Sequence, residues 1–177
     1  DRFAVDEIDL DRLDAAWGKV QKRHGMMRAS VEEDGTQSIA PSSKIGHIER
    51  AECANSSEAK QQLEEIKRTV FALAKPPLHR VVSISWHEES GKQTRLVFCF
   101  DYTVLDALSV MTVLAELAEL YENPGADLPG IGLTFRDFVV GHRSDGREVE
   151  EAEGYWRSRL PELPPAPQLP LAADPST

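Results

Sequence analysis

The run from Thr94 to Tyr102 limits the fold of this chain more than any other part of the sequence, because it is apolar on both faces of a predicted strand. The alternating side chains are Leu96, Phe98 and Phe100 on one face, and Val97 and Cys99 on the other. Such a strand has to be covered on both sides, so we predict that it lies at the centre of a sheet. Asp101 ends the apolar run, and a strong helical pattern begins at Asp106.

Other apolar patterns predict further helices and strands around this strand. Helical spacing predicts helices over residues 9–24, from Ser56 or Ser57 to about Val70, and over residues 106–121, 134–142 and 148–160. Strand alternation predicts strands over residues 26–31, 36–39 and 80–87, and Asp34-Gly35 is a hairpin turn signal. Helices and strands mixed in this order favour an α/β fold, in which helices pack against one sheet.

The composition and charge argue against several classes of protein. The net charge is −10, and neither Lys nor Arg forms a basic stripe, which argues against a nucleic-acid partner. No apolar run approaches the roughly 20 residues of a membrane span, and the first residues lack the pattern of a secretion signal. We interpret Cys53 and Cys99 as reduced thiols of a cytoplasmic protein. The sequence has no Gly-rich phosphate loop, no CxxC pair and no His-x-x-x-His pair, so it predicts no nucleotide and no metal.

Both ends of the sequence suggest a piece of a longer protein. Helical spacing begins soon after Asp1, and the last stretch, residues 161–177, is rich in Pro and has no element to pack on. This much Pro is incompatible with a regular helix or a central strand, so we expect an extended, polyproline-like arm. The arm would be a crossover between two lobes or a linker, and these two interpretations are almost the same.

Two carboxylates and a hydroxyl lie where the apolar strand passes into a helix, and they belong to Asp101, Asp106 and Ser109. Strand ends that meet helix N-termini are common sites of chemistry, because main-chain N–H groups and the helix dipole meet there. A simpler interpretation is that Asp106 caps the helix, with Ser109 in its first turn, and that Asp101 is a solvated strand end. From spacing alone we favour the simpler interpretation.

A second candidate is the segment of residues 23–28, which reads Arg-His-Gly-Met-Met-Arg. Arg28 falls in a strand that is predicted to be half-buried, and an Arg there normally has a carboxylate partner. We therefore predict that Arg28 pairs with Asp106 and fixes the floor of a site. The alternative is a surface Arg on an edge strand. His24 lies at a helix end, where an interaction with the helix dipole is more common than catalysis.

Together, these motifs resemble the condensation-domain superfamily of nonribosomal peptide synthetases. Ordinary members carry His-His-x-x-x-Asp-Gly, where residues 101–107 of this chain read Asp-Tyr-Thr-Val-Leu-Asp-Ala. Tyr102 therefore stands in the place of the expected catalytic His. Heterocyclization domains carry Asp-x-x-x-x-Asp-x-x-Ser at this place, and Asp101, Asp106 and Ser109 match every specified residue.

Two further signatures of heterocyclization domains occur in the expected order. Residues 23–28 and 34–37 resemble Arg-His-x-Met-Leu-Arg followed by Asp-Gly-x-Gln, with Met27 in place of Leu. Residues 163–175 resemble the Pro-rich signature Leu-Pro-x-x-Pro-x-Leu-Pro-Leu followed by Pro. The resemblance covers nearly the whole chain, but the family's opening Phe-Pro-Leu segment and its C-terminal lobe have no counterpart in it.

The resemblance implies a chloramphenicol-acetyltransferase-like lobe, with a mixed β-sheet packed by helices. Residues 1–160 would be the N-terminal lobe, and residues 161–177 the crossover toward the C-terminal lobe. The whole domain would condense an acyl or peptidyl donor with Cys, Ser or Thr and cyclodehydrate the product to thiazoline or oxazoline. No cofactor would bind directly, because both substrates arrive on phosphopantetheine arms. The partners would be the upstream and downstream carrier proteins, the C-terminal lobe and an adenylation domain.

The same resemblance assigns roles within the motifs. Asp101, Asp106 and Ser109 would be the catalytic residues, and Arg28 and Tyr102 would support the site. Since the residues implicated in cyclodehydration belong to the C-terminal lobe, the N-terminal lobe alone is expected to be inactive. The alternative is a degenerate, non-catalytic lobe that serves as a docking scaffold for carrier proteins. An epimerase-like or acyltransferase relative is the weakest interpretation, because the His is missing.

Overall fold

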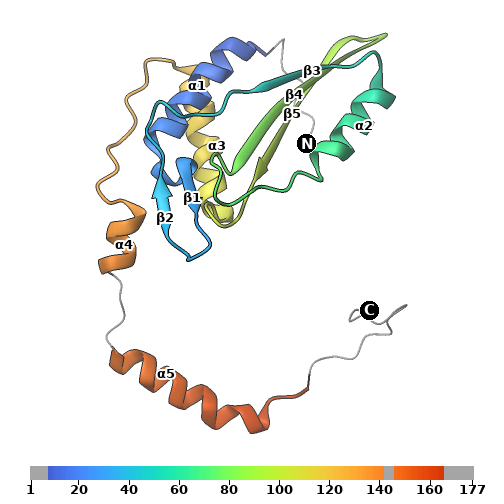
Figure 1. Cartoon of the computed structure of the whole chain (residues 1–177). Helices are drawn as coiled ribbons and strands as arrows, with labels where there is room; N and C mark the ends of the chain where they lie inside the picture. Colours follow the sequence, from blue (N-terminus) through green and yellow to red (C-terminus); the bar gives the residue numbers. More distant parts are fainter. Residues whose placement is uncertain (1–7, 142–145, 166–177) are drawn as a thin grey trace. The chain divides into compact units, whose positions relative to one another are not determined.

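The computed structural model describes residues 8–141 and 146–165 of the chain, and it divides the chain into two compact units. The first unit comprises residues 1–135 and contains the elements from α1 to α3 and from β1 to β5 (Figure 1). The second unit comprises residues 136–177. The arm predicted over residues 161–177 lies outside the described residues from residue 166 onward.

The first unit is built on a three-stranded sheet with the order β3-β4-β5. β4 (His79–Glu88) and β5 (Gly91–Phe100) are antiparallel, and β3 (Glu49–Glu52) lies parallel to β4 on its other side. Among the described strands, β4 is therefore central and β5 lies at an edge. The prediction that the run from Thr94 to Tyr102 is central is wrong, because apolar side chains on both faces of a strand do not determine whether both of its edges are paired.

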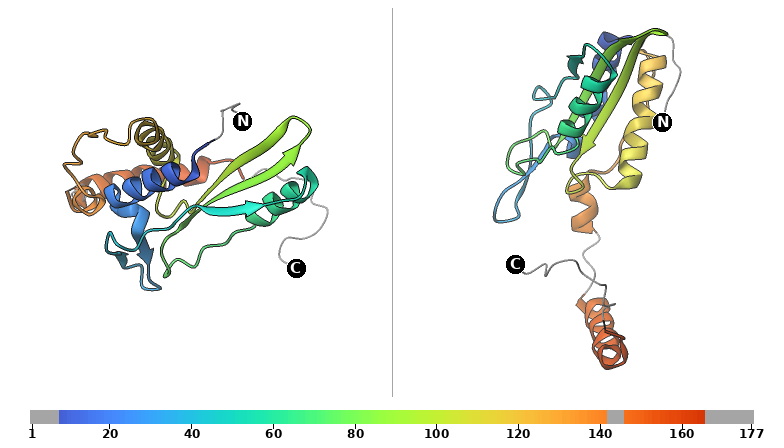
Figure 2. Two further views of the ribbon diagram at one scale, coloured as in Figure 1. Left: turned by 90° about the horizontal axis from the view of Figure 1, so that it is seen from above. Right: turned by 90° about the vertical axis from the view of Figure 1, so that its right-hand side faces the viewer.

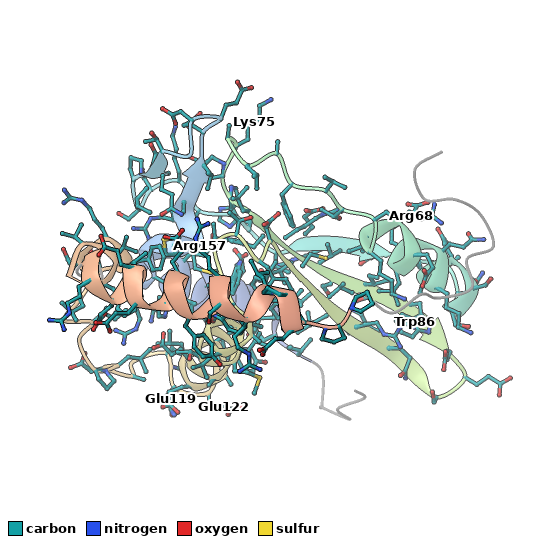
Figure 3. All side chains as sticks on the ribbon, turned by 90° about the horizontal axis from the view of Figure 1, so that it is seen from below. Arg68, Lys75, Trp86, Glu119, Glu122 and Arg157 are labelled. Carbon is teal, nitrogen blue, oxygen red and sulfur yellow. The ribbon has the colours of Figure 1, made fainter. Side chains whose placement is uncertain are left out.

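The two faces of this sheet carry separate hydrophobic clusters, and the right-hand view of Figure 2 shows helices on either side of the strands. α1 (Leu10–Arg23) and α3 (Ala107–Glu122) cover the face of the larger cluster, and α2 (Ser56–Ile66) covers the other. The predicted alternation is confirmed. The larger cluster receives Leu96, Phe98 and Phe100. The smaller one receives Val82, Ile84, Trp86, Val97 and Cys99, of which Trp86 is labelled in Figure 3.

Each of these helices begins at a polar side chain that accepts hydrogen bonds from free N–H groups of the first turn. The caps are Asp9 for α1, Asn55 for α2 and Asp106 for α3. The predictions of Asp9 and Asp106 as N-caps are confirmed. The cap of α2 lies one residue before the predicted serines, because the carboxamide oxygen of Asn55 accepts hydrogen bonds from the N–H groups of Ser57 and Glu58, both at 3.0 Å.

α2 is shorter than its sequence pattern indicates. It ends at Ile66, where the hydroxyl of Thr69 donates to the Ile66 carbonyl oxygen at 2.6 Å and turns the chain. Val70, which we predicted to lie in the buried stripe of this helix, is exposed as a result.

A short hairpin follows α1. β1 (Ala29–Val31) and β2 (Gln37–Ile39) pair antiparallel, and Gly35 takes a φ of 83° in the turn, as the Asp-Gly signal predicts. Residues 26–28, which we predicted as the beginning of the first strand, belong instead to a 3-10 helix over Gly25–Arg28. The chain curls there because the side chain of Arg28 turns back onto the end of α1.

Polar side chains of α1 fix the segment that leads into β3. Asp14 accepts a hydrogen bond from the N–H of Ile48 at 2.7 Å. Gln21 is fully buried, and its carboxamide binds both the N–H and the carbonyl oxygen of Gly46, at 2.7 and 2.8 Å. The sequence does not predict β3, because residues 49–52 have no apolar pattern. Its position follows from these contacts and from pairing with β4.

The second unit contains α5 (Gly146–Arg159) and a 3-10 turn over Leu160–Glu162, and α4 (Phe135–Gly141) begins at its boundary. The helices predicted over residues 134–142 and 148–160 are thus confirmed within the described residues. On α5, the rings of Tyr155 and Trp156 meet edge to face, with centroids 5.3 Å apart.

Candidate functional site

Asp101, Tyr102 and Asp106 lie on the loop that joins β5 to α3, and Ser109 lies in the first turn of α3. Figure 1 shows this junction, whereas Arg28 belongs to the 3-10 helix before β1. β5 ends where the N–H of Asp101 donates to the carbonyl oxygen of Leu78 at 3.0 Å. Val104 and Leu105 are buried in the larger cluster and anchor the loop against the core. The loop therefore holds the predicted residues at one strand–helix junction.

The carboxylate of Asp101 is half-buried and is held by a tight turn. Its Oδ1 accepts hydrogen bonds from the N–H of Thr103 at 2.9 Å and from the Thr103 hydroxyl at 2.5 Å. The N–H of Val104 closes the turn on the Asp101 carbonyl oxygen at 3.2 Å. In the part of the chain that the structure describes, Oδ2 has no protein donor. Asp101 therefore presents one fixed oxygen that can accept a hydrogen bond from a bound group.

Asp106 is the N-cap of α3, as the simpler sequence interpretation predicts. Its Oδ1 accepts a hydrogen bond from the N–H of Ser109 at 2.8 Å. A hydrogen bond from the Ser109 hydroxyl, and then that from its N–H, hold the pKa of Asp106 below its ordinary value. Asp106 is therefore a carboxylate at neutral pH, and the Ser109 hydroxyl is bound to this weakly basic group.

The predicted ion pair between Arg28 and Asp106 is wrong for the described residues. The guanidinium of Arg28 instead binds main-chain carbonyl oxygens, and its Nε donates to Ala40 at 3.0 Å. Its Nη1 donates to the carbonyl oxygens of Gln21, Lys22 and His24 at the end of α1. A helix end has free carbonyl groups and a negative dipole, so it is a favourable partner for this cation.

Tyr102 is exposed, and His24 makes a contact that the sequence did not predict. Tyr102 follows Asp101 in the turn, and its side chain is 75% exposed. His24 is the C-cap residue of α1, and its Nε2 lies 2.6 Å from Oε2 of Glu116 on α3. His24 therefore contacts a carboxylate in addition to lying at the helix end that the sequence predicts.

Glu116 is a functional candidate that the sequence interpretation missed. Its two carboxylate oxygens accept hydrogen bonds from Nε of Arg23 at 3.1 and 3.0 Å. Arg23 and His24 belong to the segment that the sequence singled out. The sequence does place Glu116 between Val113 and Leu117, which lie on the core-facing side of the predicted helix. A carboxylate near that side indicates that it has a partner.

His79 is a buried ionisable group beside the junction. It is 4% exposed, pairs across the sheet with Phe100, and meets the ring of Trp17 edge to face at 5.1 Å. Burial lowers the pKa of His79 from 6.5 to about 4, and a hydrogen bond with the main chain of Met27 opposes this only in part. His79 is therefore neutral at physiological pH and belongs to the core.

A surface pocket of about 470 Å³ lies away from the junction. Its walls are formed by Lys19, Arg23, Leu120, Ala126, Asp127, Leu128 and Ile131. None of the predicted site residues lines it. Over residues 8–141 and 146–165, no group of three or more His, Cys, Asp or Glu side chains is placed to hold a metal ion. No helix in these ranges is both long and apolar enough to cross a membrane.

Comparisons with known proteins agree with the sequence motifs. The sequence model of the condensation domain matches residues 3–177. Phenyloxazoline synthase MbtB of Mycolicibacterium paratuberculosis is 31% identical over 184 residues, which cover 97% of this chain and 15% of the synthase. Pyochelin synthetase PchF of Pseudomonas aeruginosa is 30% identical over 181 residues, which cover 97% of this chain and 10% of the synthetase.

Among solved structures, the cyclization-docking bidomain of the nonribosomal peptide synthetase EpoB from Sorangium cellulosum matches with a TM-score of 0.84 and 32% identity. The match covers 97% of this chain and 35% of the bidomain. The chain thus spans only a part of each of these relatives. The chloramphenicol-acetyltransferase-like α/β fold that the sequence predicts is confirmed. The chain belongs to the condensation-domain family, and within it to the N-terminal lobe of a heterocyclization-type domain of a nonribosomal peptide synthetase.

Proposed function

We propose that this chain supplies one wall of a heterocyclization site. The whole domain joins a carrier-bound acyl or peptidyl donor to a carrier-bound Cys, Ser or Thr and then closes a thiazoline or oxazoline ring. The observation that carries the proposal is the half-buried carboxylate of Asp101, which has one fixed acceptor oxygen beside the capped end of α3. The similarity to a phenyloxazoline synthase supports the ring-forming step.

The first step is amide formation. The amine of the acceptor attacks the thioester carbon of the donor, a C–N bond forms and the C–S bond breaks. The proton of the amine passes to the departing thiolate. The free oxygen of Asp101 accepts a hydrogen bond from the attacking amine and orients its lone pair toward the thioester carbon.

The second step is cyclodehydration. The side-chain sulfur or oxygen of the acceptor loses its proton and attacks the new amide carbon, so that the amide oxygen becomes a hydroxyl. The attack closes the ring by the new C–S or C–O bond. The hydroxyl then leaves as water with the proton of the ring nitrogen, and a C=N bond forms within the ring. The charge of Asp106 stabilises positive character that develops on the ring nitrogen. Ser109 holds Asp106 and is not a nucleophile, because the carboxylate that its hydroxyl contacts has a lowered pKa and is therefore too weak a base to activate it.

The complete reaction needs more than this chain. The match covers about a third of the cyclization-docking bidomain, so we infer that the lobe alone forms no product. In this proposal residues 1–160 form the lobe, and residues 161–177 lead toward the C-terminal lobe. The other partners are an adenylation domain and two carrier proteins, whose phosphopantetheine arms deliver the substrates. We further propose a cytoplasmic location for the assembly.

Mass spectrometry of the downstream carrier tests this function, after the whole domain has been mixed with both loaded carriers. We expect a product that joins donor and acceptor and has lost one further water. Asp101→Asn keeps the turn but removes the charge, and should slow product formation by about 10²–10⁴-fold. Asp34→Asn is the matched control, because Asp34 accepts a hydrogen bond from Thr36 in the same i to i+2 pattern at 2.8 Å.

Three other outcomes contradict parts of the proposal. An amide that keeps its water would make the domain a condensation variant. An unchanged rate in Asp101→Asn would remove the role of Asp101. Carrier binding without any product in the unsubstituted domain would favour the alternative, which is a non-catalytic docking scaffold.

A further inference from the structure

Glu116 lies in the middle of α3 and is largely buried against the end of α1. Its side chain is 17% exposed, and it binds Arg23 through both carboxylate oxygens and His24 through one. We propose that Glu116 is a positioning residue of the candidate site, which fixes α3 on α1 and thereby places Asp106 and Ser109. This inference rests on the proposed function.

The partners of Glu116 are held rigidly by other contacts. Arg28 binds the carbonyl oxygens of the last turn of α1. Arg23 donates a second hydrogen bond, from Nη2, to the carbonyl oxygen of Pro129, and Lys19 donates to that of Pro124. Nε of Arg28 also donates to the carbonyl oxygen of Ala40, so the end of α1 is tied to the segment after β2, and we expect a change at Glu116 to move α3 rather than α1.

The apolar contacts between the two helices do not fix their register by themselves. Trp17 and Val20 of α1 lie in one apolar cluster with Val113 and Leu117 of α3. Apolar burial has no preferred direction, so it tolerates sliding of one helix along the other. A charge-assisted contact with two acceptor oxygens has a defined geometry, and it opposes such sliding.

The contact is close enough to the junction to control its position. Asp106 precedes Glu116 by ten residues, which is about 15 Å along a helix. A helix is stiff over that length, so a shift at Glu116 is passed on to Asp106 and Ser109. A misplacement of about 1 Å can slow a reaction about a hundredfold.

The other end of the same helix pair offers a matched control. Arg12 of α1 donates to the carbonyl oxygen of Glu122 at 2.6 Å and lies over the ring of Tyr121, 4.8 Å from its centroid. This contact also joins α1 to α3, but it lies about 24 Å along the helix from Asp106. Arg12→Gln therefore weakens the same interface at the end that is distant from the junction.

The test compares Glu116→Gln with Arg12→Gln in the whole domain with loaded carriers. We expect similar losses of thermal stability in the two variants. Glu116→Gln should lower kcat by about ten- to a hundredfold with KM for both carriers unchanged, whereas Arg12→Gln should leave kcat unchanged. In Arg23→Gln combined with Glu116→Gln, kcat should equal that of either single variant, because one contact is lost in each case.

Equal losses of kcat in Glu116→Gln and Arg12→Gln, or independent losses from Arg23→Gln and Glu116→Gln, would overturn the inference. If Glu116→Gln does not fold, His24→Gln removes only the 2.6 Å contact, and an unchanged kcat there overturns it. If the unsubstituted domain forms amide without a ring, the proposed function fails and Glu116 is tested on the rate of amide formation. If it forms neither product, both proposals fail.

Discussion

The two faces of the β4–β5 sheet differ in what they bury. The face under α1 and α3 encloses Trp17 and Met27 together with two polar side chains, Gln21 and His79. The face under α2 has a smaller cluster, with Ala59, Ile66, Val82 and Ile84 fully buried in it. Polar groups inside a core bind in only a few geometries, so they specify positions that apolar packing leaves loose. The candidate junction lies next to the face under α1 and α3, whose positions are fixed by these polar groups.

The largest expected loss in the free energy of unfolding comes from a cavity under α1. Trp17→Ala removes a fully buried ring that meets His79 and Phe98, and we expect a loss of about 4 kcal/mol in the free energy of unfolding. Ile66→Ala makes a cavity under α2, and we expect a loss of about 2 kcal/mol because the smaller cluster relaxes around it. Urea denaturation measures both. Because Ile66→Ala removes the smaller side chain, an equal loss in the two variants would mean that the face under α2 relaxes less than the face under α1.

The pH dependence of stability tests the larger cluster through its buried His79. Burial lowers the pKa of His79 to about 4 in the folded chain, from 6.5 when it is exposed. The unfolded chain therefore binds the proton more readily, so stability is complete above pH 6.5 and falls as the pH is lowered. The loss is about 3 kcal/mol and is complete near pH 4.

The control for this titration is His79→Gln, which keeps a polar side chain but has no proton to bind. Urea denaturation of both chains between pH 7 and pH 4 isolates the contribution of His79, since the other ionisable groups are shared. A constant difference between the two chains over this range would show that His79 is not buried in its neutral form.

The third expected effect concerns Arg28, which binds carbonyl oxygens instead of the predicted partner Asp106. Its guanidinium binds four carbonyl oxygens, so Arg28→Gln should lower the free energy of unfolding by about 2 kcal/mol. Calorimetric melting of both chains measures this. If Arg28 is only a helix cap, Arg28→Gln combined with Asp106→Asn should show additive losses. Strongly non-additive losses would instead indicate that Arg28 and Asp106 form the ion pair that the sequence predicted.

Local patterns made much of the fold predictable. The strands around residues 80–100 follow from apolar alternation, and the β1–β2 turn follows from Asp34-Gly35, because each feature is encoded within a few residues. Asp9 and Asp106 could be predicted as caps for the same reason. The candidate junction was predictable because its residues lie within one short stretch of sequence.

The features that the sequence did not predict depend on distant partners. β3 has no apolar pattern and is positioned by β4, about thirty residues later in the chain. The acceptors of Arg28 are main-chain carbonyl oxygens, which no side-chain pattern reveals. Glu116 could be seen as a carboxylate near the core face of a helix, but its partners Arg23 and His24 are about ninety residues away.

The smallest expected effect compares the caps of the helices on the two faces. Asp106→Ala removes the cap of α3, and Asn55→Ala removes the cap of α2. Each should lower the free energy of unfolding by about 1 kcal/mol. Only Asp106→Ala should also slow formation of the heterocycle, because only α3 begins at the candidate junction. Denaturation of the chain and mass spectrometry of the carrier in the whole domain measure the two quantities.

Asp106→Asn then separates the two roles that one carboxylate combines. The carboxamide keeps an oxygen that caps α3, so stability should stay within about 0.5 kcal/mol, while the negative charge is lost. A slower reaction with unchanged stability would assign the effect to charge at the junction. A variant that keeps both its stability and its rate would reduce Asp106 to a helix cap, equivalent to Asn55 on the other face. The smaller cluster and the larger one would then differ in packing alone, and Asp101 would remain the only carboxylate of the junction with a chemical role.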